Sequence, residues 1–156
     1  MSLQVNGFMP PDSDVHAILS RVQSFHEKQT ALCDRLEMLA NSLPENFNPQ
    51  EALVIARQIM PLISEAHRFE ENVLFHLIDQ DSTSAQSLER LKFEHWEDEA
   101  SGEDLTDALL SYARSPKPVM TDKLAYMLRG FFDNLRRHIA FEVEHIVPAV
   151  KKKALG

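Results

Sequence analysis

Two His-x-x-x-Glu pairs constrain the fold of this chain more than any other feature of its sequence. They span His67–Glu71 and His138–Glu142, and a lone histidine, His26 or His95, precedes each pair by 41 or 43 residues. Residues four apart on an α-helix share nearly the same face, so each pair directs an imidazole and a carboxylate toward one point. The two halves together supply four histidines and two carboxylates, a ligand set that suits two transition-metal ions.

The composition predicts one all-α domain. A chain of 156 residues is large enough to bury a polar site within a single core. It has only 4 glycines, and most of its 8 prolines lie between or at the ends of segments with helical periodicity. The net charge of −8 argues against binding to nucleic acid or to an anionic membrane. There is no long apolar run and no leader pattern, so we expect a cytoplasmic location.

The apolar periodicity predicts four helices, at about 12–41, 49–79, 84–114 and 120–153. The connections between them are short, which favours an antiparallel up-down-up-down four-helix bundle. Residues 1–11 show no periodicity and are predicted to form a flexible N-terminal arm before the domain at 12–156.

The buried stripes of the second and fourth helices contain ionisable residues. In the second helix the predicted inward positions are Ala56, Met60, Ile63, His67, Glu71, Leu74 and Ile78, with Glu70 toward solvent. In the fourth they are Leu124, Leu128, Phe131, Leu135, His138, Glu142, His145 and Ala149. Burying unpaired charge is costly, so these positions need partners, and a metal centre supplies them.

The order and spacing of these residues resemble the hemerythrin-like, or HHE cation-binding, domains over about residues 12–153. The resemblance implies a bundle that holds two iron ions in a non-haem, carboxylate-bridged centre. It further implies that the terminal ligands are His26, His67, His95 and His138 and that the bridging carboxylates are Glu71 and Glu142. The residue types alone also suit Mn or Zn. A ferritin-like oxidase would instead show Glu-x-x-His, the reverse order.

The chain departs from oxygen-carrying hemerythrins at two positions. Those proteins have a second histidine one turn along the third helix and an aspartate in the fourth, whereas this chain has Glu99 and Glu142. The departures argue against stable oxygen carriage and favour an exchangeable position on one metal. Glu99 is an additional candidate ligand, and so is His145, for which a hydrogen bond to a ligand is the alternative.

Three functions remain open at this level. The first is a domain that binds or senses O2, NO, iron or redox state, and that signals through a protein partner or a homodimer. The second is a di-iron redox enzyme or iron-handling protein, acting in peroxide reduction, NO reduction or iron-centre repair. The third is a bundle whose histidines and acids pair without metal. Neither nucleic acid nor membrane is expected as a partner.

Two further side chains carry expectations of their own. Cys33, the single cysteine, shares the stripe of His26 and is predicted to be a small buried hydrophobe. Trp96 points away from the stripe of His95 and is predicted to pack between helices.

Overall fold

A computed structural model describes residues 12–78 and 82–155, and every regular element within them is helical. The long helices are α1 (Asp12–Ser42), α2 (Pro49–Phe69), α3 (Ser82–Arg114), α4 (Thr121–Phe141) and α5 (Val147–Leu155). Short π-helices follow α2 (η1, Glu70–Leu74) and α4 (η4, Glu142–Ile146), and 3₁₀ turns span Phe75–Leu77 (η2) and Pro118–Met120 (η3). The predicted arm at 1–11 lies outside the described residues.

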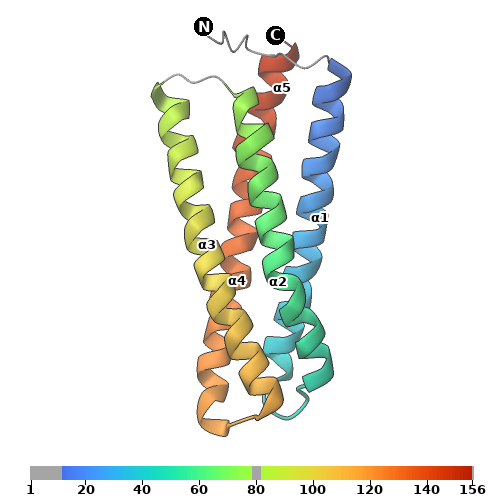
Figure 1. Ribbon diagram of the computed structural model, residues 1–156, viewed down its shortest axis with the longest axis vertical. Coiled ribbons are helices and arrows are strands. Elements are labelled where there is room, and N and C mark those ends of the chain that lie inside the picture. The colour runs from blue at the N-terminus through green and yellow to red at the C-terminus, as the bar shows by residue number, and fades with distance from the viewer. Residues whose placement is uncertain (1–11, 79–81, 156) are drawn as a thin grey trace, which may run out of the picture.

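The helices form the predicted antiparallel bundle (Figure 1). α1 packs mainly against α4, and α2 packs mainly against α3. The segment α4–η4–α5 forms one long rod, so that α5 ends beside the first turns of α1 (Figure 1). Within the described residues, no helix is long and apolar enough to cross a membrane.

Local chemistry explains where the helices begin and end. The side chain of Asn48 accepts hydrogen bonds from the backbone N–H groups of Gln50 (3.1 Å) and Glu51 (3.2 Å) and so caps α2, which begins at Pro49. α3 ends at Arg114, just before the predicted breaker containing Pro116 and Pro118. The predicted helix boundaries lie within two residues of those observed.

α2 and α3 approach each other closely at Gly102. A Cβ atom at this position would lie 3.0 Å from Sδ of Met60 and 3.4 Å from Cδ1 of Ile63. The glycine therefore permits close packing between the helices, and α3 continues through it without interruption.

The core consists of two apolar clusters separated by a polar layer. The larger cluster spans Leu32–Ala40 of α1, Ala52–Ile63 of α2, Leu105–Ala113 of α3 and Leu124–Ile139 of α4. The smaller one contains Val15, Val22, Leu74, Phe75, Ile78, Leu88, Leu91, Ile146 and Val150. Between them lie the buried polar residues His26, Gln29, His67, Glu70, His95, Asp98, His138 and Glu142. Each of the four long helical segments, α1, α2 with η1 and η2, α3, and α4 with η4 and α5, contributes two of these residues. The polar layer therefore extends across the whole bundle.

Both π-helices lie in this layer, one at each His-x-x-x-Glu pair. The N–H of Phe75 donates to the carbonyl of Glu70, and the N–H of Val147 donates to that of Glu142, each five residues back. A π turn contains one residue more than an α-helix accommodates, so every later side chain is rotated. Beyond η4 the buried positions differ from those that a continuous α-helix would give, whereas Leu74 and Ile78 of the second predicted helix are buried as predicted.

Candidate metal centre

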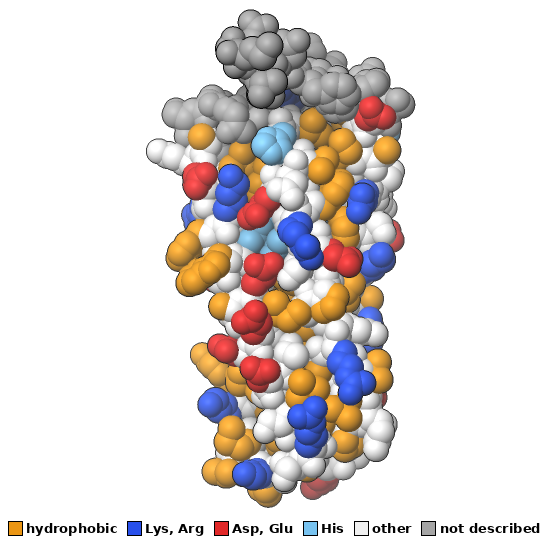
Figure 2. All heavy atoms as spheres, in the orientation of Figure 1, with side chains coloured by type: hydrophobic (Ala, Val, Ile, Leu, Met, Phe, Trp, Pro, Cys, Tyr) orange, Lys and Arg blue, Asp and Glu red, His pale blue; other side chains and the backbone are white. Residues whose placement is uncertain are grey.

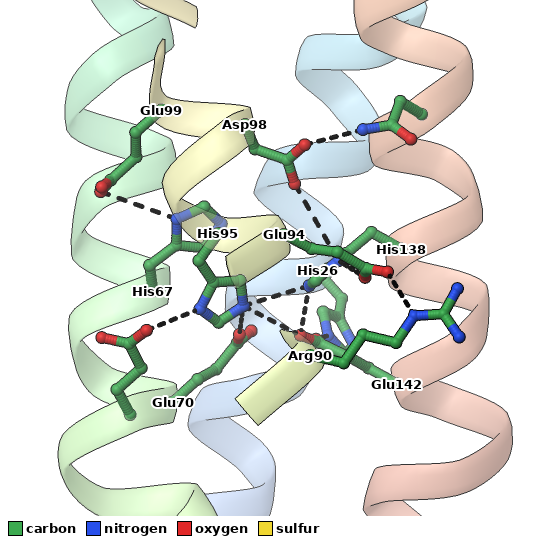
Figure 3. A network of polar contacts seen from close by, with 12 residues as sticks. His26, His67, Glu70, Arg90, Glu94, His95, Asp98, Glu99, His138 and Glu142 are labelled. Atoms are coloured by element: carbon green, nitrogen blue, oxygen red, sulfur yellow. Dashed lines mark hydrogen bonds and ion pairs between the residues drawn. The ribbon is translucent and has the colours of Figure 1, made fainter. Parts of the chain in front are cut away.

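Four buried side chains converge at the centre of the polar layer. They are Glu70, His95, His138 and Glu142, and each offers a ligand atom within 4.8 Å of the ligand atoms of the others. Glu70 and Glu142 begin the two π-helices, while His95 and His138 come from α3 and α4 (Figure 3). Sequence-distant segments thus bring two nitrogens and two carboxylates to one point.

The distances within this cluster are those of ligands around one ion. The Nε2 atoms of His95 and His138 lie 3.2 Å apart. Two nitrogens about 2.1 Å from one ion at an angle of about 90–110° would be separated by roughly 3.0–3.4 Å. Oε1 of Glu142 lies 2.8 Å from Nε2 of His138, and Oε2 of Glu70 lies 2.9 Å from Nε2 of His95.

Glu142 connects the cluster to α1. It is completely buried, and its second oxygen, Oε2, lies 2.6 Å from Nε2 of His26. Its two oxygens therefore face histidines on different helices, His26 on α1 and His138 on α4. A carboxylate held in this way has the geometry needed to bridge two ions.

Several buried polar atoms have no hydrogen-bond partner, and these support metal binding. Both ring nitrogens of His67 are buried without a partner, and so is Oε2 of Glu70, which faces His95 in a geometry unsuited to a hydrogen bond. The ring of His67 stacks on that of His95, with centroids 3.8 Å apart and planes within 8°. Buried polar atoms normally have partners, so these atoms fit a cation better than a closed hydrogen-bond network.

The protonation of these residues reflects burial and mutual contact. Burial, followed by the nearby charge of Glu142, raises the pKa of Glu70 well above its ordinary value. Burial and the neighbouring histidines lower the pKa of His67 to about 2, so its ring is neutral. Burial disfavours the charged form of His95, but the contacts of its ring with the carboxyl groups of Glu142 and Glu70 outweigh this and raise its pKa to about 10.

The pKa of Glu142 moves in the opposite direction to that of Glu70. Burial alone would raise it, but hydrogen bonds with His138, His26 and His95 hold the pKa well below its ordinary value. Two adjacent buried carboxyl groups thus differ, Glu70 neutral and Glu142 charged. An ion bound by both would have to displace the protons on Glu70 and His95.

The inner carboxylate from the second rod is Glu70, which the sequence pattern placed toward solvent. Glu70 is 2% exposed, whereas the side chain of Glu71 is 34% exposed at the edge of the layer. Both residues lie near the face of His67, three and four positions after it, and the wider turn that begins at Glu70 directs the first of them inward. Glu71 instead lies against His95, with Oε1 3.3 Å from Nδ1.

The predicted inward position of His145 is also wrong. Its side chain is 60% exposed and lies beside the ring of Phe141. The π turn at Glu142–Ile146 rotates the chain, so that Ile146 and Val150 are buried where His145 and Ala149 were expected. The apolar character of Ile146 was the signal that the sequence offered for this shift.

Glu99 lies outside the central cluster but against one of its neighbours. Its side chain is 36% exposed, and Oε1 is 3.6 Å from Nδ1 of His67. The four predicted histidine ligands, His26, His67, His95 and His138, are all buried in the polar layer.

Asp98 is a buried residue of this region that the sequence pattern did not indicate. Oδ1 accepts a hydrogen bond of 2.7 Å from Nδ2 of Asn134, while Oδ2 lies 4.0 Å from Nδ1 of His138. Asp98 follows His95 by three residues, so helical spacing places it near the same face. That spacing was the available signal.

Of the two further expectations, one is confirmed and one is wrong. Cys33 is completely buried in the larger apolar cluster. Trp96 is 66% exposed and contacts Phe93 on the surface of α3, instead of packing between helices.

A four-helix bundle with a buried layer of histidines and carboxylates defines a class of cation-binding proteins. Residues 17–150 match the hemerythrin HHE cation binding domain, and the chain belongs to this family. No curated protein and no solved structure matches the chain. Metal-cation binding thus follows from the family and agrees with the buried ligand cluster.

Proposed function

We propose that this domain holds a carboxylate-bridged di-iron centre and uses it to bind or sense a small diatomic gas, O2 or NO. The observation that carries the proposal is Glu142, one of whose oxygens lies against His26 and the other against His138. One ion would lie among His95, His138 and the carboxylates. The other would be held by His26 and His67, the remaining buried histidines of the layer, and both ring nitrogens of His67 lack hydrogen-bond partners.

Two carboxylates are needed between the ions, and the second comes from the Glu70–Glu71 pair. We place Glu70 there because it is buried and faces the cluster. In this arrangement Glu71, which follows the family pattern, contacts the outer nitrogen of His95 and orients the ring. Glu99 lies in the same way against Nδ1 of His67 and would orient that ring.

Bound iron would supply redox chemistry and affinity for diatomic gases. The protein excludes water from the layer along the length of the bundle, because apolar clusters with fully buried residues such as Ile63 and Leu74 lie on either side of it. Excluding water in this way strengthens polar interactions within the layer and limits side reactions.

The experiment is anaerobic loading of metal-free protein with ferrous iron, followed by metal analysis and exposure to O2 or NO. We expect about two iron ions per chain and a long-lived change in the visible spectrum. Loading with Mn²⁺ and Zn²⁺ in parallel tests the choice of metal. Fewer than about one bound ion of any metal per chain would refute the proposed function. Rapid consumption of NO or peroxide would show that the domain is an enzyme and not a gas-binding or gas-sensing protein.

A further inference from the structure

We propose that the groove between α3 and α4 is the entrance through which a divalent cation reaches the buried cluster, with Glu94 and Asp98 holding it on the way. This inference rests on the proposed metal function and adds a route to it. The groove has a volume of about 620 Å³, and its lining includes His138, a member of the cluster. It therefore connects the surface with one ligand of the centre.

Two carboxylates converge at the inner end of this groove. Oε2 of Glu94 lies 3.7 Å and Oδ2 of Asp98 lies 4.0 Å from Nδ1 of His138 (Figure 3). The side chain of Asp98 is only 7% exposed, and its Oδ2 has no hydrogen-bond partner although Asn134 holds the other oxygen. An unpartnered, buried carboxylate oxygen lining a groove is a group that a passing cation would satisfy.

The imidazole of His138 separates this groove from the cluster. Nδ1 faces Glu94 and Asp98, while Nε2 on the other edge of the ring lies 3.2 Å from His95 and 2.8 Å from Glu142. A cation held by the two carboxylates has to pass the edge of one ring to reach the centre. The two carboxylates thus stand directly outside the cluster.

Arg90 opposes the entrance of a cation. Its Nε lies 3.2 Å from Oε1 of Glu94, so the guanidinium competes for the carboxylate that the cation would use. The Arg90 side chain is 82% exposed, and an ion pair so open to water is weak. Arg90 can therefore release Glu94 readily, and we expect it to slow the uptake of the cation only slightly.

A second groove, between α1 and the α4–α5 rod, reaches His26 but lacks this convergence. It includes the apolar side chains of Leu19, Val22 and Ile139, with Glu27 among its polar residues. Of the carboxylates in the described residues, the one within ion-pair distance of His26 is Glu142, inside the cluster. The α1–α4 groove thus offers a cation no pair of carboxylates beside the histidine. Glu27 provides a matched charge for the test.

The test is the rate at which metal-free protein takes up Co²⁺, followed by visible absorption after rapid mixing. Charged grooves raise the association rates of opposite charges by about 10–10³-fold. We expect Glu94→Gln to slow uptake by roughly tenfold and Arg90→Gln to accelerate it. The double variant should be as slow as Glu94→Gln, because Arg90 acts through Glu94.

Glu27→Gln, with the same loss of charge in the other groove, should leave the rate unchanged. Circular dichroism before mixing verifies that each variant is folded. Equal rates for wild type and Glu94→Gln, or slower uptake in Glu27→Gln, would overturn the entrance while leaving the metal site intact. Failure of the wild type to bind Co²⁺ or Fe²⁺ would instead refute the proposed function and the entrance with it.

Discussion

His95 and His138 are oriented in the same way, each with one nitrogen inward and one toward an outer carboxylate. Nε2 of each ring faces the cluster, while Nδ1 of His95 faces Glu71 and Nδ1 of His138 faces Asp98 and Glu94. Outer carboxylates of this kind fix the tautomer and orientation of a metal-binding imidazole. Residues near a ligand in sequence therefore divide into inner ligands and outer partners, which only three-dimensional geometry distinguishes.

Glu70 and Glu71 give a direct test of this division. We expect Glu70→Gln to weaken metal binding by more than about 100-fold, because it removes an inner ligand. Glu71→Gln should weaken it by about 10-fold, the low end of the range for an outer partner. Competition titration against a chromogenic chelator measures both affinities. A greater loss in Glu71→Gln would instead assign the inner position to Glu71, as the sequence pattern predicted.

Cys33 is expected to be chemically inert in the folded protein. Burial raises the pKa of its thiol to about 12, and the thiol donates a weak hydrogen bond of 3.8 Å to the carbonyl of Phe132. Only the thiolate reacts, and the ordinary cysteine pKa is about 8.5, so at pH 8 alkylation by iodoacetamide should be roughly a thousandfold slower than in denaturant. Mass spectrometry follows the labelling. Comparable rates in the native and denatured protein would show that Cys33 is accessible.

At the scale of elements, the π turns mark the limit of prediction from periodicity. The spacing of apolar residues predicted the four long helical segments, and the short connections between them predicted the antiparallel bundle. A continuous 3.6-residue period has no place for an extra residue within a turn. In the fourth helix the predicted stripe was therefore correct through Glu142 and wrong at His145, directly after the π-helix began.

Substitutions at two adjacent residues, His145 and Ile146, test the register of η4. Ile146→Ala should lower the free energy of unfolding by about 2–4 kcal/mol, because Ile146 is 5% exposed in the smaller apolar cluster. His145→Ala, at an exposed position, should change it by less than about 0.5 kcal/mol and leave the metal content unchanged. Chemical denaturation gives both values. If His145→Ala were the more destabilising substitution, the chain would continue as an α-helix after Glu142, with His145 facing inward.

At the scale of the molecule, many of the acidic side chains gather on one side of the bundle. Figure 2 shows acidic side chains gathered along the α2–α3 side of the bundle, with a histidine surface among them. Glu71 and Glu99 lie at the edge of the polar layer between these two helices, beside His95 and His67. Net charge from the sequence excluded nucleic acid as an expected partner. The net charge could not show that part of it lies against buried histidines, because this depends on how each helix is rotated about its own axis.

We expect the polar layer to make the stability of the whole bundle dependent on bound metal. Without a cation, both ring nitrogens of His67, Oε2 of Glu70 and Oδ2 of Asp98 stay buried without hydrogen-bond partners, which disfavours the folded state. An ion at 100 times its dissociation constant adds about 2.7 kcal/mol to the free energy of unfolding. For a domain of this size that corresponds to a rise in Tm of roughly 5–10 °C.

We therefore expect chelation to lower Tm by about this amount and metal to restore it, as measured by scanning calorimetry. Glu142→Gln, which removes the carboxylate between His26 and His138, should unfold at the same temperature with and without metal. The comparison separates stabilisation through the layer from weak binding at surface acids, because surface acids are unchanged in the variant. A wild-type Tm that did not respond to chelator or metal would mean that the layer is held together by its own ion pairs, such as those of Glu142 with His95 and His138.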